Sequence, residues 1–145
     1  MRFQKLQGRA HGWYSDRERV IVLKEGMSEL QTIKTLAHEV AHAIMHNERE
    51  MDPSLTRPRM EVEAESVAYI ICRHFGLDTG DYSFAYLASY SGGAELQELK
   101  ASMERIHTAS AVIITRMELI MDPEPEKELL FQGGREEELI MSVSP

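Results

Sequence analysis

The chain has 145 residues, which is enough for one domain with a hydrophobic core and short for two. Hydrophobic residues make up 43% and charged residues 28%, as in ordinary globular proteins. No apolar run approaches the roughly 20 residues of a membrane-spanning helix, so we expect no membrane partner. The formal net charge of -8 disfavours direct nucleic-acid binding by this domain, because phosphate contacts need clustered Lys and Arg. Cys72 is the single cysteine, and the N-terminus has no apolar signal-peptide core, so we expect a cytoplasmic protein.

Residues 11–26 predict two short strands joined by a polar turn. The second strand, RVIVL, is rich in β-branched residues and ends near Gly26. Ser28 then begins a predicted helix, because Gln31 follows three residues later, as in a capping box. Apolar residues recur at helical spacing to about residue 47. They are Leu30, Ile33, Leu36, Ala37, Val40, Ala41 and Ile44.

The second half of the chain is predicted to be helical. A proline-interrupted loop leads to a second helix at about residues 59–75, and a short helical stretch follows at residues 82–90. A long amphipathic helix covers about residues 94–121, and its apolar stripe predicts core packing. Beyond it the composition becomes acidic and is interrupted by Gly and Pro. We therefore expect a domain over residues 1–121 and a poorly ordered acidic tail over residues 122–145.

His38, Glu39 and His42 form the pattern H-E-x-x-H inside the first predicted helix. Residues four apart lie one turn apart on one face, so both imidazoles can bind a single zinc ion at about 2.0–2.1 Å. Glu39 lies about 100° round the helix from His38, where a base can take a proton from a zinc-bound water. The alternative is a surface helix with two histidines. The apolar neighbours disfavour it, because buried imidazoles need partners.

Two other sources of a third zinc ligand fail, one on distance and one on residue type. His46 continues the histidine face, but a rise of about 1.5 Å per residue puts it about 12 Å from His38 along the helix axis. The metzincin pattern requires Gly at position 45 and His at position 48, where this chain has Met45 and Glu48.

The second predicted helix offers carboxylates instead. Glu61 can be the third ligand, and Glu65, one turn further on, can hydrogen-bond a ligating histidine from behind. Ala64 and Ala68 share this face and would let the two helices approach closely. Glu63 points elsewhere, roughly 160° from Glu65. The alternative is that these acidic residues only favour the helix N-terminus through its dipole.

Two segments, HEVAHAIMH and EVEAESVAYIICRHFGL, together resemble the gluzincin-type peptidase domains of the ImmA/IrrE group. They are most similar to the metallopeptidase part of ArdC/LtrC-like antirestriction proteins, which mobile elements carry. The resemblance covers roughly residues 11–120. It implies three zinc ligands, a catalytic acid/base and a carboxylate behind a ligand. In that order these are His38, His42 and Glu61, then Glu39, then Glu65.

The same resemblance implies an α+β fold of the zincin type. A short antiparallel sheet would lie beside the HExxH helix, further helices would follow, and an edge strand could pair with an extended peptide. RVIVL is the strand that we assign to this sheet. The chain departs from the resemblance because it has no room for the single-stranded-DNA-binding domain of ArdC proteins or for the partner domain of ImmA/IrrE proteins.

These patterns predict a zinc-dependent metallopeptidase that hydrolyses peptide bonds in a protein substrate, with Glu39 as the general base that activates a zinc-bound water. The resemblance adds a regulatory or antirestriction role on a mobile element. The alternative is a non-catalytic, zinc-stabilised module that binds a repressor or restriction protein. A helical scaffold without metal is a third possibility, which the pairing of the two motifs opposes. Four residues could donate to the oxyanion, although none is assigned: Tyr69, His74, Tyr86 and Tyr90.

Overall fold

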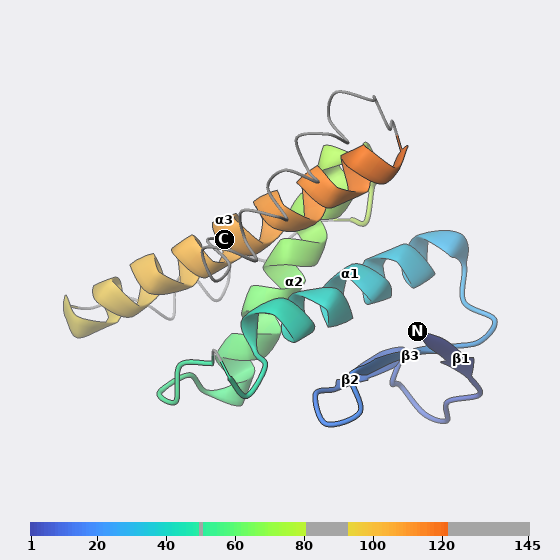
Figure 1. The fold of residues 1–145 in the computed structure, drawn as a ribbon, viewed down its shortest axis with the longest axis horizontal. Coiled ribbons are helices and arrows are strands. Elements are labelled where there is room, and N and C mark those ends of the chain that lie inside the picture. Colours follow the sequence, from blue (N-terminus) through green and yellow to red (C-terminus); the bar gives the residue numbers. More distant parts are fainter. Residues whose placement is uncertain (50, 81–92, 122–145) are drawn as a thin grey trace, which may run out of the picture. The chain divides into compact units, whose positions relative to one another are not determined.

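The computed structural model describes residues 1–49, 51–80 and 93–121. The chain divides into two compact units, residues 1–111 and 112–145, and the site lies in the first. In chain order the elements are the strands β1 (Arg2–Gln4), β2 (Gly12–Ser15) and β3 (Val20–Lys24), then the helices α1 (Glu29–Met45), α2 (Arg57–His74) and α3 (Gly93–Met121) (Figure 1). This α+β architecture is compatible with the predicted small zincin-like domain. The predicted helix at residues 82–90 and the predicted tail at 122–145 lie outside the described residues.

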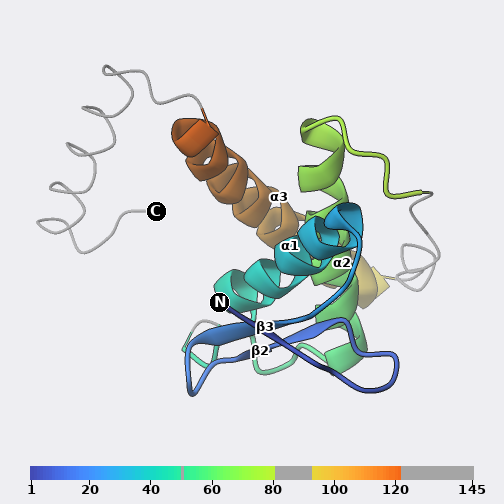
Figure 2. The ribbon, with the colours of Figure 1, turned by 90° about the vertical axis from the view of Figure 1, so that its right-hand side faces the viewer.

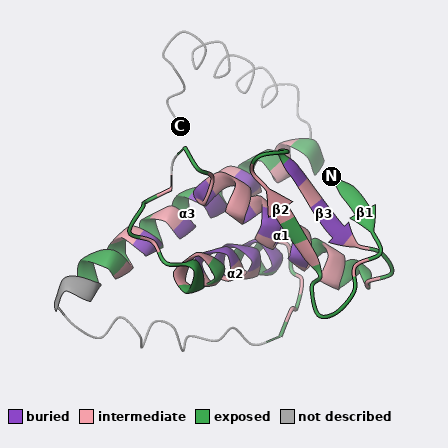
Figure 3. Ribbon diagram, turned by 90° about the horizontal axis from the view of Figure 1, so that it is seen from below, coloured by how far each residue is buried: buried purple, intermediate pink, exposed green. Residues whose placement is uncertain are grey.

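The sheet is mixed, although the sequence predicted an antiparallel one. Its order is β1-β3-β2, with β2 antiparallel to β3 and β1 parallel to β3. The hairpin of β2 and β3 was predicted, whereas the exposed, three-residue β1 gives no alternating pattern that would reveal it. A parallel pair needs a long connection, and here the intervening β2 hairpin supplies it. Val22 and Leu23 of the central strand are fully buried (Figure 3), which confirms RVIVL as the core strand.

Helix α1 lies against the sheet and also packs against α2 (Figures 1 and 2). It begins after Ser28, whose Oγ accepts a hydrogen bond from the Gln31 backbone N–H at 3.1 Å, as the sequence predicted. The Gln31 side chain donates instead to Thr35 Oγ1 at 3.0 Å. Ala37 and Ala41 are buried because α1 has neighbours on more than one side.

Helix α2 is positioned by small residues and by defined ends. Thr56 caps its N-terminus, and Gly76 follows its C-terminus with a positive φ of 75°, a conformation that glycine adopts without strain. Ala64, Ala68 and Cys72 have no exposed surface, in agreement with the predicted face of small residues. This face brings the carboxylates of α2 close to the histidines of α1.

Helix α3 buries only part of its predicted apolar stripe, of which Ile106, Ala109 and Ile113 are buried. Leu96 and Met103 belong to the stripe but are 48% and 55% exposed. Ser102 and Ala109 are buried together with Ile106. The burial of the Ser102 hydroxyl is explained by a carboxylate of α2, described below. Among the described helices, none has the length and apolar character needed to cross a membrane.

Candidate metal centre

Two imidazoles of α1 and one carboxylate of α2 converge on a common point. His38 Nε2 lies 3.1 Å from Glu61 Oε2, and His42 Nε2 lies 3.2 Å from Glu61 Oε1. The two Nε2 atoms are 3.1 Å apart. The four-residue spacing on α1 places the two rings edge to face, and the N-terminal turns of α2 bring the carboxylate opposite them. The structure thus brings together the three residues that the sequence predicted as metal ligands.

The separations within this group fit a zinc ion. Tetrahedral zinc with bonds of about 2.0–2.1 Å holds its ligand atoms about 3.3–3.4 Å apart. The two Nε2 atoms are 3.1 Å apart, close to this value, and each lies 3.1–3.2 Å from a different oxygen of Glu61, so one ligand atom from each residue lies within 4.8 Å of the other two. Two imidazole nitrogens and one carboxylate oxygen are also a donor set that zinc accepts while keeping one position for another ligand. The three side chains therefore suit zinc in both chemistry and spacing.

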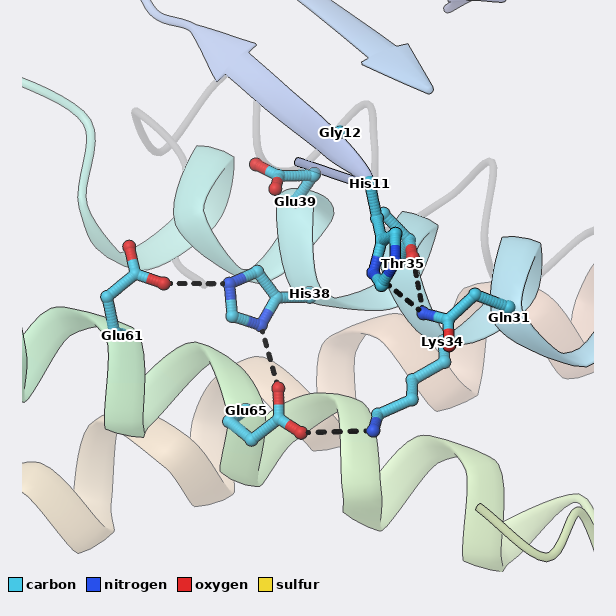
Figure 4. Close-up of a pocket in the computed structure, with 9 residues that line it drawn as sticks. All are labelled: His11, Gly12, Gln31, Lys34, Thr35, His38, Glu39, Glu61 and Glu65. Atoms are coloured by element: carbon cyan, nitrogen blue, oxygen red, sulfur yellow. Dashed lines mark hydrogen bonds and ion pairs between the residues drawn. The ribbon is translucent and has the colours of Figure 1, made fainter. Parts of the chain in front are cut away.

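The imidazole of His38 is held from behind by Glu65. Its Nδ1 lies 3.2 Å from Glu65 Oε2, and Lys34 Nζ lies 3.3 Å from Glu65 Oε1 (Figure 4). The hydrogen bond with His38, assisted by Lys34, lowers the pKa of Glu65 to about 2. An ionised carboxylate only accepts hydrogen bonds, so Nδ1 of His38 carries the proton and Nε2 faces Glu61. Burial opposes charging of His38, but the hydrogen bond to Glu65 and the surrounding carboxylates raise its pKa.

The imidazole of His42 is in a different electrostatic setting. Burial lowers its pKa to about 4, and the attraction of Glu61 only partly opposes this. His42 is therefore neutral at pH 7, which is the protonation state that binds a metal ion. On its other side, His42 Nδ1 lies 2.8 Å from His46 Nδ1.

Glu39 lines a cavity of about 310 Å³ beside the converging ligands. Figure 4 shows Glu39 on the β2 side of α1, whereas His38 points toward α2. Burial raises the pKa of Glu39 against the opposing attraction of His38, and a carboxyl group with a raised pKa is better matched to proton transfer near neutral pH. The other cavity-lining residues are His11, Gly12, Gln31, Lys34, Thr35, His38, Glu61 and Glu65. The Glu61 side chain is 52% exposed, so the cavity opens to solvent.

A buried network around Glu63 was missed by sequence reasoning. Glu63 has no exposed surface and accepts hydrogen bonds from Arg105 and Ser102 of α3. Its Oε1 also lies 2.9 Å from His46 Nε2. Although burial alone would raise the pKa of Glu63, the hydrogen bonds from His46, Arg105 and Ser102 lower it. The available signal was the spacing of His42 and His46, four residues apart, which continues the histidine face of α1.

His11 and Gly12, at the point where β2 begins, were also missed as part of the cavity. Gly12 lies so close to its neighbours that an added Cβ would be 2.8 Å from Val22 O and 2.9 Å from Thr35 Cγ2. His11 lines the cavity, with its Nδ1 3.4 Å from Gln31 Nε2. A polar residue in a short hairpin carries no periodic signal, so the sequence did not indicate these positions.

Of the four candidate oxyanion donors, the two that the structure describes, Tyr69 and His74, do not line this cavity. The Tyr69 ring lies 6.0 Å from the guanidinium carbon of Arg73. The His74 ring contacts that of Phe75 at the end of α2. The other two candidates, Tyr86 and Tyr90, lie outside the described residues.

Comparison with known proteins supports one family for the N-terminal half of the chain. Residues 1–72 match the peptidase M78 family, described as the IrrE N-terminal-like domain. This match covers β1 to the end of the buried part of α2, and it supports an ImmA/IrrE-type domain with a possible metallopeptidase role. Within it lie all of the residues that converge on the candidate metal centre.

A curated relative extends the similarity further along the chain. An uncharacterized protein from Bacillus anthracis is 34% identical over 110 residues, which is 74% of this chain. The chain spans only 18% of that relative's length. No solved structure matches the chain.

Proposed function

We propose that this protein is a zinc-dependent metallopeptidase that hydrolyses peptide bonds in a protein substrate. The observation that carries the proposal is the convergence of His38, His42 and Glu61 beside an open cavity that Glu39 also lines. The family match to an IrrE N-terminal-like peptidase domain supports it independently, because that family is typically zinc-dependent.

The chain's own residues divide the chemistry between them. His38, His42 and Glu61 hold the zinc ion, which when bound polarises a carbonyl group and lowers the pKa of a water molecule to about 7. Glu39 accepts a proton from the attacking water on its carboxylate and delivers it to the leaving amine nitrogen. Its raised pKa suits both halves of this transfer. Glu65 keeps the proton of His38 on Nδ1, so that Nε2 stays free for the metal.

The substrate is an extended peptide. Strand β2 stands at one end of the sheet order, and its first residue, Gly12, lines the cavity with Glu39. An edge strand offers unpaired backbone groups to which an extended chain can add. A peptide paired with β2 would run along the cavity, which brings a backbone carbonyl near the metal ligands.

The alternative is a zinc-stabilised interaction module without turnover, and the family does include non-catalytic members. A cavity that opens to solvent beside the ligands favours the enzyme, because a purely structural zinc site is closed. The buried Glu39 carboxylate also favours it, since Glu39 is not needed as a ligand.

Two variants test the proposal. Glu39→Gln should bind one equivalent of zinc and lose peptidase activity, because the amide cannot accept the proton. His38→Ala should lose zinc, measured by metal analysis of the purified protein. Full activity of Glu39→Gln would remove the assignment of the base, and a full zinc equivalent in His38→Ala would place the metal elsewhere.

The regulatory or antirestriction role and the cytoplasmic location belong to the same proposal. They are tested by identifying, with mass spectrometry, which proteins of the host cell are cut by the wild type and left intact by Glu39→Gln. Cleavage of a transcriptional repressor or a restriction protein is the expected result. Cleavage confined to unrelated, unfolded proteins would contradict the role.

A further inference from the structure

The two metal-facing histidines are both contacted on the nitrogen that points away from the metal. Nδ1 of His38 meets Glu65 Oε2 at 3.2 Å, and Nδ1 of His42 meets His46 Nδ1 at 2.8 Å. The first contact is direct to a carboxylate. The second contact leads on to a carboxylate as well, because His46 Nε2 lies 2.9 Å from Glu63 Oε1. Each ligand histidine is thus connected to a carboxylate of α2, one directly and one through a second imidazole.

In the series His42–His46–Glu63, which nitrogen donates and which accepts can be assigned by starting from the buried Glu63. Glu63 accepts from Arg105 Nη2 at 2.7 Å and from Ser102, so it is an ionised acceptor. His46 must then donate to Glu63 from Nε2. The 2.8 Å contact between the two Nδ1 atoms needs one donor and one acceptor, and with its proton on Nε2 the His46 ring accepts at Nδ1 from Nδ1–H of His42. The remaining lone pair of His42 is on Nε2, which faces Glu61 and His38.

We propose that His46, Glu63 and Arg105 are positioning residues that hold the His42 imidazole with its Nε2 lone pair directed at the metal. The inference rests on the metal site of the proposed function, and it adds three residues that neither the HExxH pattern nor the ligand set contains. Arg105 fixes the Glu63 carboxylate, Glu63 fixes His46, and His46 fixes the ring orientation and tautomer of His42.

Burial supports a role beyond the packing of α1, α2 and α3. The Glu63 side chain is 0% and the His46 side chain 3% exposed, so solvent does not screen or replace these bonds. A buried charged network is seldom more stabilising than apolar side chains of the same volume. Its connection to the back of a ligand histidine gives it a function that apolar residues could not supply, because a ligand with a hydrogen-bonded second nitrogen is more basic and better oriented.

The test uses the full chain and compares His46→Leu, His46→Gln and a control, His107→Leu. His107 is exposed on α3, is not among the residues of the network, and provides the same substitution. Zinc affinity is measured by competition with a chelator, and the visible spectrum of the cobalt-substituted protein reports ligand geometry. Far-UV circular dichroism of the metal-free proteins reports whether each variant is folded.

His46→Leu should weaken zinc binding about 10- to 100-fold and alter the cobalt spectrum, because the His42 ring loses its partner. His46→Gln should recover most of the affinity, since its amide can accept from His42 and donate to Glu63. His107→Leu should match the wild type. Wild-type affinity and an unchanged cobalt spectrum in His46→Leu would overturn the inference.

A measurement on the unmutated protein gives an answer even if the leucine variant fails to fold. In the zinc-loaded wild type, 15N spectra of the histidine side chains should show His42 protonated on Nδ1 and His46 protonated on Nε2. The opposite tautomer of His46 would overturn the inference. A wild-type chain that binds no zinc would overturn the proposed function itself, whereas normal zinc binding with an unperturbed His46→Leu overturns the positioning role alone.

Discussion

His38 and His42 face the same carboxylate with the same ring nitrogen, but they are supported from opposite environments. Behind His38 stands Glu65, whose side chain is 47% exposed and is paired with Lys34. Behind His42 the hydrogen bonds lead through His46 to Glu63, which has no exposed surface. Solvent screens the contact between Glu65 and His38, whereas the hydrogen bonds from His42 through His46 to Glu63 lie in the core. Metal affinity should therefore be separable from fold stability at Glu65 and coupled to it at Glu63.

The largest difference between the two supports is expected in the metal-free protein. Glu63→Ala removes the buried carboxylate that Arg105 and His46 both contact, so it should lower the free energy of unfolding by about 3 kcal/mol. The matched change Glu65→Ala removes an exposed carboxylate and should lower it by about 1 kcal/mol or less. Urea unfolding in the presence of a chelator, followed by circular dichroism, measures both. Equal losses in the two variants would contradict the comparison.

The next effect is the loss of zinc affinity when Glu65, the exposed carboxylate behind His38, is changed. In the wild type, free zinc at 100 times its dissociation constant should add about 2.7 kcal/mol to the free energy of unfolding. Glu65→Gln keeps the shape but loses the charge behind His38. We expect this variant to bind zinc about tenfold more weakly. The same zinc concentration should then add only about 1.4 kcal/mol to its free energy of unfolding.

The measurement is the difference between unfolding free energies with zinc and with chelator. Glu65→Gln should change this difference while leaving the metal-free value close to that of the wild type. If zinc raises the free energy of unfolding of Glu65→Gln as much as that of the wild type, Glu65 does not hold His38 for the metal.

The smallest effect is expected at Asp16, which connects the β2–β3 turn to the chain just beyond His46. Its Oδ2 accepts from the Glu48 backbone N–H at 3.1 Å, and its Oδ1 accepts from Tyr14. These hydrogen bonds, that of Glu48 first, lower the pKa of Asp16. A carboxyl group with a lowered pKa in the folded state contributes stability above its unfolded pKa, and this contribution disappears as pH falls through the folded value.

Asp16→Asn should therefore be slightly less stable than the wild type at pH 7, and the difference should vanish below the lowered pKa. Thermal unfolding at a series of pH values measures this. Zinc affinity should stay at the wild-type value, because Asp16 contacts no residue of the network behind His42. A loss of zinc binding would show that this support extends into the sheet.

Local patterns predicted the half of the site that depends on helix geometry. The spacing of His38 and His42 requires only one regular helix, and the Ser28 cap that begins it was readable. The choice of Glu61 over its neighbours followed from which face of α2 carries small residues, and Ala64 is indeed fully buried there. Each of these inferences used periodicity within a single element, which sequence expresses directly.

The missed half depends on partners that are distant in sequence. Glu63 was interpreted through the helix dipole, whereas its cation, Arg105, comes from α3 and lies 42 residues further along the chain. His46 was tested only as a metal ligand of the His38 face, and its distance from His38 excluded that role. Its actual neighbour is His42, one turn away. The parallel pairing of β1 was missed for a similar reason, since strand order is a tertiary property.

Gly12 lies where β2 approaches α1 beside the cavity, and a single added carbon atom there would change that approach. Because no side chain stands at this position, the backbone of β2 comes into van der Waals range of Thr35 on α1. A methyl group at this position would collide with Thr35 and push β2 away from α1, the helix that carries Glu39. The absence of a side chain at Gly12 therefore sets how closely β2 can approach α1 beside the cavity.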